Sequence, residues 1–187
     1  MNKRIWIVLG IVGLMVAALT TAALASPSRA AEPDALVDAV RQATAGYKEA
    51  EAAQAAGYGL FHGCVSGPQG GAMGIHFVNG DVVGDGEVDA SRPEALLYEA
   101  KGGKMRLLGV EYVVIADAWN ANHKAPPVLM GQLFNYVSSP NRYGLPAFYE
   151  LHVWAWQKNP SGVFADWNPQ VSCEAYTGDM NMPGEGH

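Results

Sequence analysis

From Tyr58 onward the sequence consists of short β-rich runs separated by Gly, Pro, Asn and Asp, and this pattern restricts the fold more than any other feature. Short runs bounded by turn residues are typical of antiparallel strands. The predicted strands lie near Tyr58–Cys64, Met73–Val78, Ala95–Tyr98, Met105–Ile115, Gly131–Val137, Ala147–Gln157 and Gly162–Asp166. Pro160 and Gly162 predict a tight turn that pairs the last two runs as a hairpin. Residues 118–127 form a predicted polar loop.

The segment from Pro33 to Ala56 has a helical pattern instead. Apolar and small residues recur there at steps of three and four, which gives one narrow stripe. Pro33 suits a first helical turn, Gly57 suits a stop, and Gly46 is the point where the helix can kink or divide. One helix followed by many antiparallel strands predicts an α+β domain, with the N-terminal helix packed on a curved antiparallel β-sheet or partial barrel. A lipocalin-like closed barrel is the alternative.

The N-terminal residues have the pattern of a signal peptide. Lys3 and Arg4 precede a long apolar run, and Ala23 and Ala25 fit an A-x-A cleavage site. We therefore expect residues 1–25 to be removed and the protein to be exported, to the periplasm or the extracellular space. An uncleaved anchor is the alternative, because the run has about the 20 residues that span a bilayer.

The charge of the mature chain excludes some classes of partner. Without Lys3 and Arg4, ten basic residues remain against eighteen acidic ones, a net charge of −8. Such an acidic surface argues against nucleic acid and against anionic membranes as partners. We expect a single domain over residues 26–173 and a flexible tail over residues 174–187.

The sequence holds two cysteines, Cys64 and Cys173. Two cysteines in an exported protein predict a disulfide bond. It would close a loop of about 110 residues and stabilise the fold by roughly 4 to 5 kcal/mol in the chain-entropy model. Two free thiols or a cysteine metal ligand are the alternatives.

The candidate site residues come from the predicted strands. Glu150 and His152 lie two residues apart, so both side chains point to one face about 6.5 to 7 Å apart, close enough to share an ion. His76 and Glu111 interrupt two other apolar strands, and a buried carboxylate is costly unless it is paired or coordinated. These four groups predict a site for a small molecule or a metal ion, with Zn²⁺ or Cu²⁺ suited to imidazole and carboxylate.

Trp154 and Trp156 follow on the same predicted face and would form a wall of this pocket. The alternatives remain open: the acids and histidines can pair with neighbouring polar groups, and the tryptophans can fill a core. A hydrolase- or lyase-type enzyme that uses a His–Glu pair or a metal-bound water is another interpretation. A cell-envelope interaction module without a small-molecule site is a third.

Other patterns give weaker indications. The chain has no G-x-S-x-G elbow, and the glycines after Cys64 lack the Lys-Ser/Thr of a phosphate loop. Asp81, Asp85, Glu87 and Asp89 have the wrong spacing for an EF-hand, so a solvated acidic turn is the simpler interpretation. The tail contains Met180, Met182 and His187, which are residue types that suit Cu(I).

The segments GYGLFHGCVSGPQGGAMGIHFVN, RPEALLYE, LLGVEYVV and ELHVWAWQKNPSGVFADWNPQVSC resemble an uncharacterised family of secreted bacterial proteins. The resemblance extends from about residue 47 to Cys173. It implies one exported domain and carries no known activity.

Overall fold

The structure is a computed structural model that describes residues 33–67 and 70–178. The predicted signal peptide and the tail residues Met180, Met182 and His187 lie outside these ranges. Within them, no helix is long and apolar enough to cross a membrane.

The domain is α+β and is built on an antiparallel sheet, as predicted, and this sheet has six strands. The strand order is β1-β2-β3-β4-β8-β7. The strands are β1 Gly59–Gly67, β2 Gly71–Val78, β3 Ala95–Lys101, β4 Lys104–Ile115, β7 Asn135–Val137 and β8 Phe148–Val153; β5 Val128–Leu129 and β6 Gln132–Leu133 form a separate small pair. The helical segments are α1 Pro33–Thr44, η1 Ala45–Tyr47, α2 Ala50–Ala55, α3 Gly80–Asp85 and α4 Ala116–Asn122.

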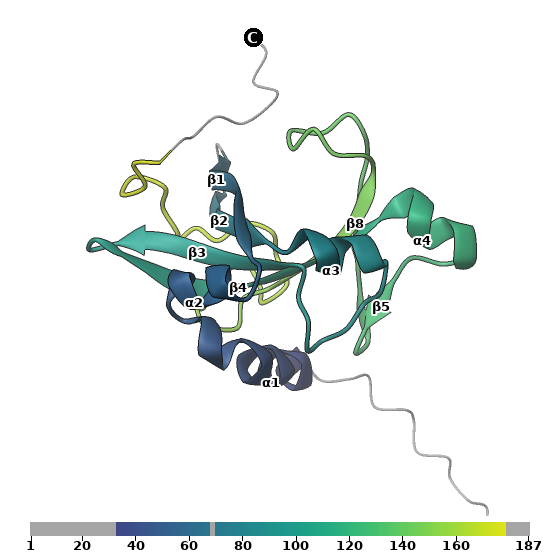
Figure 1. The fold of residues 1–187 in the computed structure, drawn as a ribbon, viewed down its shortest axis with the longest axis horizontal. Helices are drawn as coiled ribbons and strands as arrows, with labels where there is room; N and C mark the ends of the chain where they lie inside the picture. Colours follow the sequence, from purple (N-terminus) through teal and green to yellow (C-terminus); the bar gives the residue numbers. More distant parts are fainter. Residues whose placement is uncertain (1–32, 68–69, 179–187) are drawn as a thin grey trace, which may run out of the picture.

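The sheet is curved into a half-barrel. Register shifts occur between β1 and β2 and again at Leu97/Tyr98, and such bulges bend and twist a sheet. In Figure 1, β1, β2 and β8 turn steeply away from the long β3–β4 pair. β1 and β7 are the two edges of the described sheet, so it is open, unlike the closed barrel considered as an alternative.

One face of the sheet, here called the helix-side face, packs on α1 and α2 (Figure 1). Ile75, Tyr112 and Leu151 of this face are buried in one apolar cluster with Leu36 and Val40 of α1. Full burial of side chains of this size stabilises the packing by about 1.5 to 3 kcal/mol each. Gly46 lies in η1, where the predicted helix divides.

The opposite face, here called the site face, carries His76 on β2, Glu111 on β4, and Glu150 and His152 on β8. Side chains alternate between the faces of a strand, so these polar residues alternate with the apolar residues of the helix-side face. Leu151 and Val153, which alternate with Glu150 and His152 along β8, belong to the helix-side cluster.

Cys64 and Cys173 form a disulfide bond, as predicted, with their Cα atoms 5.5 Å apart and a sequence separation of 109. The bond ties the C-terminal loop to β1. A second link lies nearby, where Asn168 forms an isolated bridge with Ala72. Gly71 permits this approach: its φ is +83°, and a Cβ there would lie 2.1 Å from the carbonyl oxygen of Asn168.

Two local predictions are wrong. Residues 118–127 are not all loop, since α4 extends to Asn122. The predicted return strand Gly162–Asp166 is a series of turns. β8 pairs with β4 along its whole length and with β7 from Phe148 to Glu150, and the later segment keeps a single backbone bond, from the Trp154 N–H to the Val163 carbonyl. The Asn159 side chain instead donates to the carbonyl oxygens of Ala165 and Trp167, which holds the segment as turns.

Candidate functional site

Strand register brings His76, Glu111 and His152 together. Glu111 on β4 is directly opposite His152 on β8. On the other side β4 pairs with β3, where Ala95 is opposite Glu111 and Leu97 is opposite His76. The small Ala95 side chain leaves space above β3, so that His76 and Glu111 meet across it with Nε2 and Oε2 3.4 Å apart.

These three residues form a buried group with the spacing of metal ligands. One ligand atom of each lies within 4.8 Å of the others. His152 is completely buried, and His76 and Glu111 are 5% and 7% exposed. Two ligands of a tetrahedral Zn²⁺, each about 2.1 Å from the ion, are about 3.4 Å apart. The His76–Glu111 pair therefore already has the separation that such an ion requires.

A second group shares His152 with the first. Ligand atoms of Glu150, His152 and Asp166 also lie within 4.8 Å of one another. Nδ1 of His152 lies 3.5 Å from Oδ1 of Asp166, and the Asn135 amide donates to the same oxygen at 3.4 Å. A carboxylate on one imidazole nitrogen commonly orients the ring so that the other nitrogen can bind a metal. Nε2 of His152 is that other nitrogen.

The buried side-chain nitrogen and oxygen atoms that lack a hydrogen-bond partner are concentrated in this region. Among the described residues, these are Nε2 of His62, Nδ1 of His76, Oε2 of Glu150, and both ring nitrogens of His152. Buried polar groups are nearly always hydrogen-bonded, and a cluster of exceptions indicates a group that a water or an ion completes. All five atoms lie on residues of the site face.

Burial and charge shift the pKa values of the site in different directions. Burial lowers the pKa of His76 to about 4, so its imidazole is neutral and able to bind a metal near pH 7. Burial also acts to lower the pKa of His152, but Glu111, Asp166 and Glu150 outweigh it and raise the value to about 9. Burial and the neighbouring Glu111 raise the pKa of Glu150 to about 9. The contact with His152 holds the pKa of Asp166 below its usual range.

The four residues predicted to bind a ligand thus converge. His76, Glu111 and His152 form the first group, and Glu150 joins His152 and Asp166 in the second. Two further residues near the site were not singled out from the sequence. His62 on β1 is opposite His76, and alternation along β1 could have identified it. Asp166 comes from a turn, where no periodic pattern indicates which way a side chain points.

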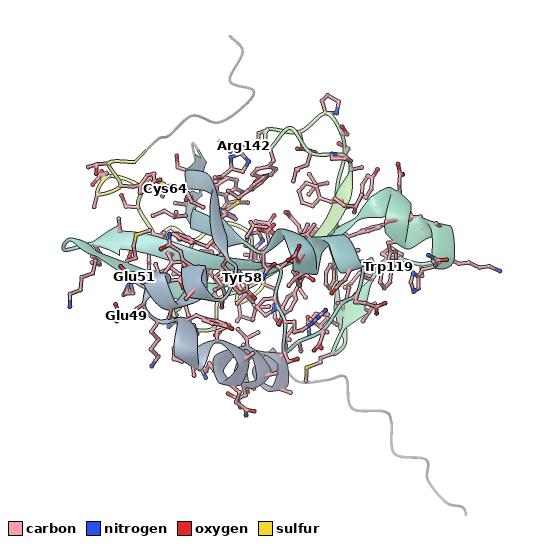
Figure 2. All side chains as sticks on the ribbon, viewed as in Figure 1. Glu49, Glu51, Tyr58, Cys64, Trp119 and Arg142 are labelled. Atoms are coloured by element: carbon pink, nitrogen blue, oxygen red, sulfur yellow. A yellow bond between two sulfur atoms is a disulfide. The ribbon has the colours of Figure 1, made fainter. Side chains whose placement is uncertain are left out.

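The two tryptophans do not line the cavity beside this site. Trp154 lies just beyond the end of β8 and packs with Leu97 and Leu108 in a separate apolar cluster, while its indole donates to the Ala165 carbonyl at 2.5 Å. The Trp156 indole donates to Thr44 of α1 at 2.9 Å. The strand ends at Val153, so the alternation that placed these rings beside Glu150 does not continue. Trp119 is in α4, far from Cys64 and β1 (Figure 2).

A cavity of about 280 Å³ opens beside His76 and Glu111. Its remaining lining is mostly apolar and comes from β1, β2, β4, β8, α3 and the loop before β8: Phe61, Val78, Gly80, Val83, Gly84, Val113, Ile115, Tyr143, Leu145 and Phe148. The Tyr143 hydroxyl contacts the Met73 thioether at 3.4 Å. Besides Tyr143, the ionisable residues that line the cavity are His76 and Glu111, which meet at its polar end.

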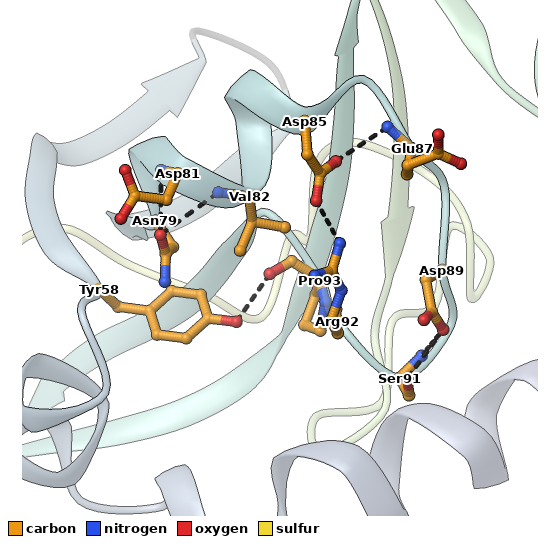
Figure 3. A network of polar contacts seen from close by, with 10 residues as sticks. All are labelled: Tyr58, Asn79, Asp81, Val82, Asp85, Glu87, Asp89, Ser91, Arg92 and Pro93. Atoms are coloured by element: carbon orange, nitrogen blue, oxygen red, sulfur yellow. Dashed lines mark hydrogen bonds and ion pairs between the residues drawn. The ribbon is translucent and has the colours of Figure 1, made fainter.

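The α3 wall of this cavity is held by polar contacts, drawn in Figure 3. The Asn79 side chain accepts from the backbone N–H groups of Asp81 and Val82 at the start of α3. At its end, Asp85 forms an ion pair with Arg92. The acidic segment considered for calcium is thus used in part for local contacts, and neither metal-spaced group in the described residues includes its acids.

Comparison of the chain with protein-family models, with curated proteins and with solved structures finds no match. The functional argument therefore rests on the geometry of the site.

Proposed function

We propose that this protein is exported and binds a transition-metal dication through His76, Glu111 and His152. The observation that carries the proposal is the convergence of the three ligand atoms within 4.8 Å in a buried site. Two imidazoles and one carboxylate are a ligand set for Zn²⁺, and imidazole also suits Cu²⁺. Asp166 would orient His152, and the Cys64–Cys173 disulfide supports an oxidising location.

Burial is the reason that a metal is favoured over a simple ion pair. Nε2 of His76 faces Glu111 and Nδ1 of His152 faces Asp166, whereas Nδ1 of His76 and Nε2 of His152 have no hydrogen-bond partner. An unpaired buried polar atom costs about 1 to 3 kcal/mol. A cation bound between the two imidazoles and the carboxylate would give a partner to the imidazole nitrogens that it contacts. It would also neutralise the negative charge of Glu111.

Elemental analysis of untagged protein tests the proposal. We expect about one equivalent of Zn or Cu per chain, lost in His76→Ala and in His152→Ala. His123→Ala is the matched control, because His123 is exposed on the C-terminal side of α4 and stacks on Trp119. No retained metal, with a melting temperature unchanged by added Zn²⁺ or Cu²⁺, would contradict metal binding and favour a metal-free His–Glu pair or an interaction module.

The cavity beside His76 and Glu111 supports a second candidate, a hydrolase- or lyase-type enzyme. Three protein ligands leave a fourth position on Zn²⁺ for a water molecule, whose pKa the ion lowers to about 7. We expect the Zn²⁺-loaded protein to hydrolyse 4-nitrophenyl acetate faster than His152→Ala does. Equal rates for the two proteins would contradict the enzyme candidate and leave metal binding intact.

A further inference from the structure

The cavity next to the candidate metal site has two chemically different ends. Val78, Val113, Ile115 and Phe148 give apolar walls, whereas His76 and Glu111 form the polar end. Both polar residues are almost fully buried, and Nδ1 of His76 has no partner. A ligand that fills this space must therefore be apolar along most of its length and polar at one end.

The size of the cavity limits the ligand. Its volume is about 280 Å³, close to the lower bound of small-molecule pockets, which is about 300 Å³. An apolar cavity of about 150 Å³ is already large enough to bind benzene. The space beside His76 thus suits a single substituted ring or a short branched chain and is too small for a long lipid. Phe61, whose side chain is 47% exposed, lies at its border with solvent.

The charge of the cavity decides what the polar end of the ligand can contact. None of the described residues that line it is a Lys or an Arg, and Glu111 is an acid. A free anionic head group would meet the carboxylate of Glu111 and no Lys or Arg side chain of the lining, and burying a poorly compensated charge is strongly unfavourable. A dication held by His76, Glu111 and His152 supplies the missing positive charge.

We propose that the cavity holds the apolar body of a small molecule whose oxygen-donor head group completes the coordination of the metal. This inference rests on the proposed metal binding, and it adds the class of ligand: a compact aromatic or branched aliphatic compound with one metal-binding oxygen group. Ligand affinity then depends on two separable parts, the metal and the apolar walls.

Gly84 of α3 allows the apolar part to be tested without touching the metal ligands. It lines the cavity, and a Cβ at this position would meet nothing within 4 Å. Gly84→Phe therefore introduces a ring beside or into the cavity without a backbone clash. Gly46→Phe is the matched control, since Gly46 is also helical, also has free space around its Cβ, and lies outside the cavity lining. Leu145→Trp, in the loop before β8, enlarges another lining side chain if Gly84→Phe does not fold.

The probes are benzohydroxamic acid and acetohydroxamic acid, which share a head group and differ in their apolar body. We expect Zn²⁺-loaded wild-type protein to bind benzohydroxamic acid at least tenfold more tightly in calorimetry. Gly84→Phe should weaken that binding at least tenfold while Zn content and acetohydroxamic acid binding stay unchanged, and Gly46→Phe should match the wild type. Equal affinity of the two probes, or unchanged benzohydroxamic acid binding in both cavity-filling variants, overturns the proposal.

A measurement on the metal-free protein separates this inference from the proposed function. Toluene has an apolar body and no head group, and its binding is followed by shifts of the Val113 and Ile115 methyl signals in NMR spectra. If toluene binds and Gly84→Phe abolishes this binding, the apolar half of the inference is supported, whether or not a metal binds. If no metal binds, the head-group half of the inference is wrong. Zn²⁺ binding without toluene or benzohydroxamic acid binding rejects the cavity and leaves the metal site.

Discussion

Nδ1 of His152 lies 3.5 Å from Oδ1 of Asp166, so the completely buried imidazole of a central strand meets the half-buried carboxylate of a turn 14 residues later. The contact sets which nitrogen faces the acid, and Nε2 on the other side of the ring has no hydrogen-bond partner. It also joins the two metal-spaced groups through one residue. The properties of the site therefore depend on a loop as well as on the sheet.

Asp166→Asn should weaken metal binding while the protein stays folded. The substitution removes the charge that favours one orientation of the His152 ring, and loss of such a partner typically lowers metal affinity 10- to 100-fold. The affinity for Zn²⁺ is measured by competition with a chelating dye. Asp117→Asn, on the exposed surface of α4, is the control. Equal affinity in Asp166→Asn and the control would show that Asp166 does not orient His152.

Glu111→Gln and Glu150→Gln should differ in their effect on metal content. Glu111 belongs to the group with both histidines, so its amide variant should lose most bound metal. Burial and the neighbouring Glu111 raise the pKa of Glu150, so replacing its carboxyl group with a neutral amide is a smaller change than at Glu111. We expect Glu150→Gln to keep its metal stoichiometry in elemental analysis. The reverse result would assign the metal to the Glu150–His152–Asp166 group.

Glu94 should make the metal-free protein less stable as the pH rises. Its side chain is 1% exposed, and burial raises its pKa from 4.5 to about 8. The folded state therefore holds a proton that the unfolded state releases between these values, so the free energy of unfolding falls from about pH 4.5 to pH 8 and then levels off. Each unit of such a shift corresponds to about 1.4 kcal/mol.

Glu94→Gln should remove this pH dependence, because an amide does not titrate. The amide oxygen can still accept the Val113 N–H, which Glu94 Oε2 accepts at 3.1 Å. We expect the variant to melt several degrees higher than the wild type at pH 9 and at a similar temperature at pH 4. Thermal denaturation over this range checks it. If the melting temperatures of the wild type and the variant differed by the same amount at every pH, burial would not keep Glu94 protonated.

Reduction of the Cys64–Cys173 disulfide should lower the melting temperature strongly. The bond closes a loop with a sequence separation of 109 residues, and a loop of this length contributes about 4 to 5 kcal/mol in the chain-entropy model. Denaturation with and without dithiothreitol measures the effect, and the Cys64→Ala/Cys173→Ala variant, unaffected by the reductant, is the control. A wild-type melting temperature that is insensitive to reduction would contradict the expected stabilisation.

Strand alternation explains why the site could be predicted in part. The two-residue spacing of Glu150 and His152 places both on one face of β8, whatever the neighbouring strands are. The sequence likewise indicated that His76 and Glu111 interrupt apolar strands. It could not indicate that these strands lie on either side of β3, because strand order depends on long-range pairing. Trp154 and Trp156 show the limit of alternation, which ends with the strand at Val153.

The sequence by itself determined the α+β class, the division of the first helix near Gly46, the cysteine pair and the face on which Glu150 and His152 lie. These features follow from residue periodicity, glycine and local chemistry, which act over a few residues or through one covalent bond. Only the tertiary structure decided that Glu111 lies opposite His152, that the small Ala95 allows His76 to reach Glu111, and that Asp166 returns from a turn to meet His152. Those contacts depend on sheet order and register, which the whole chain fixes through its packing.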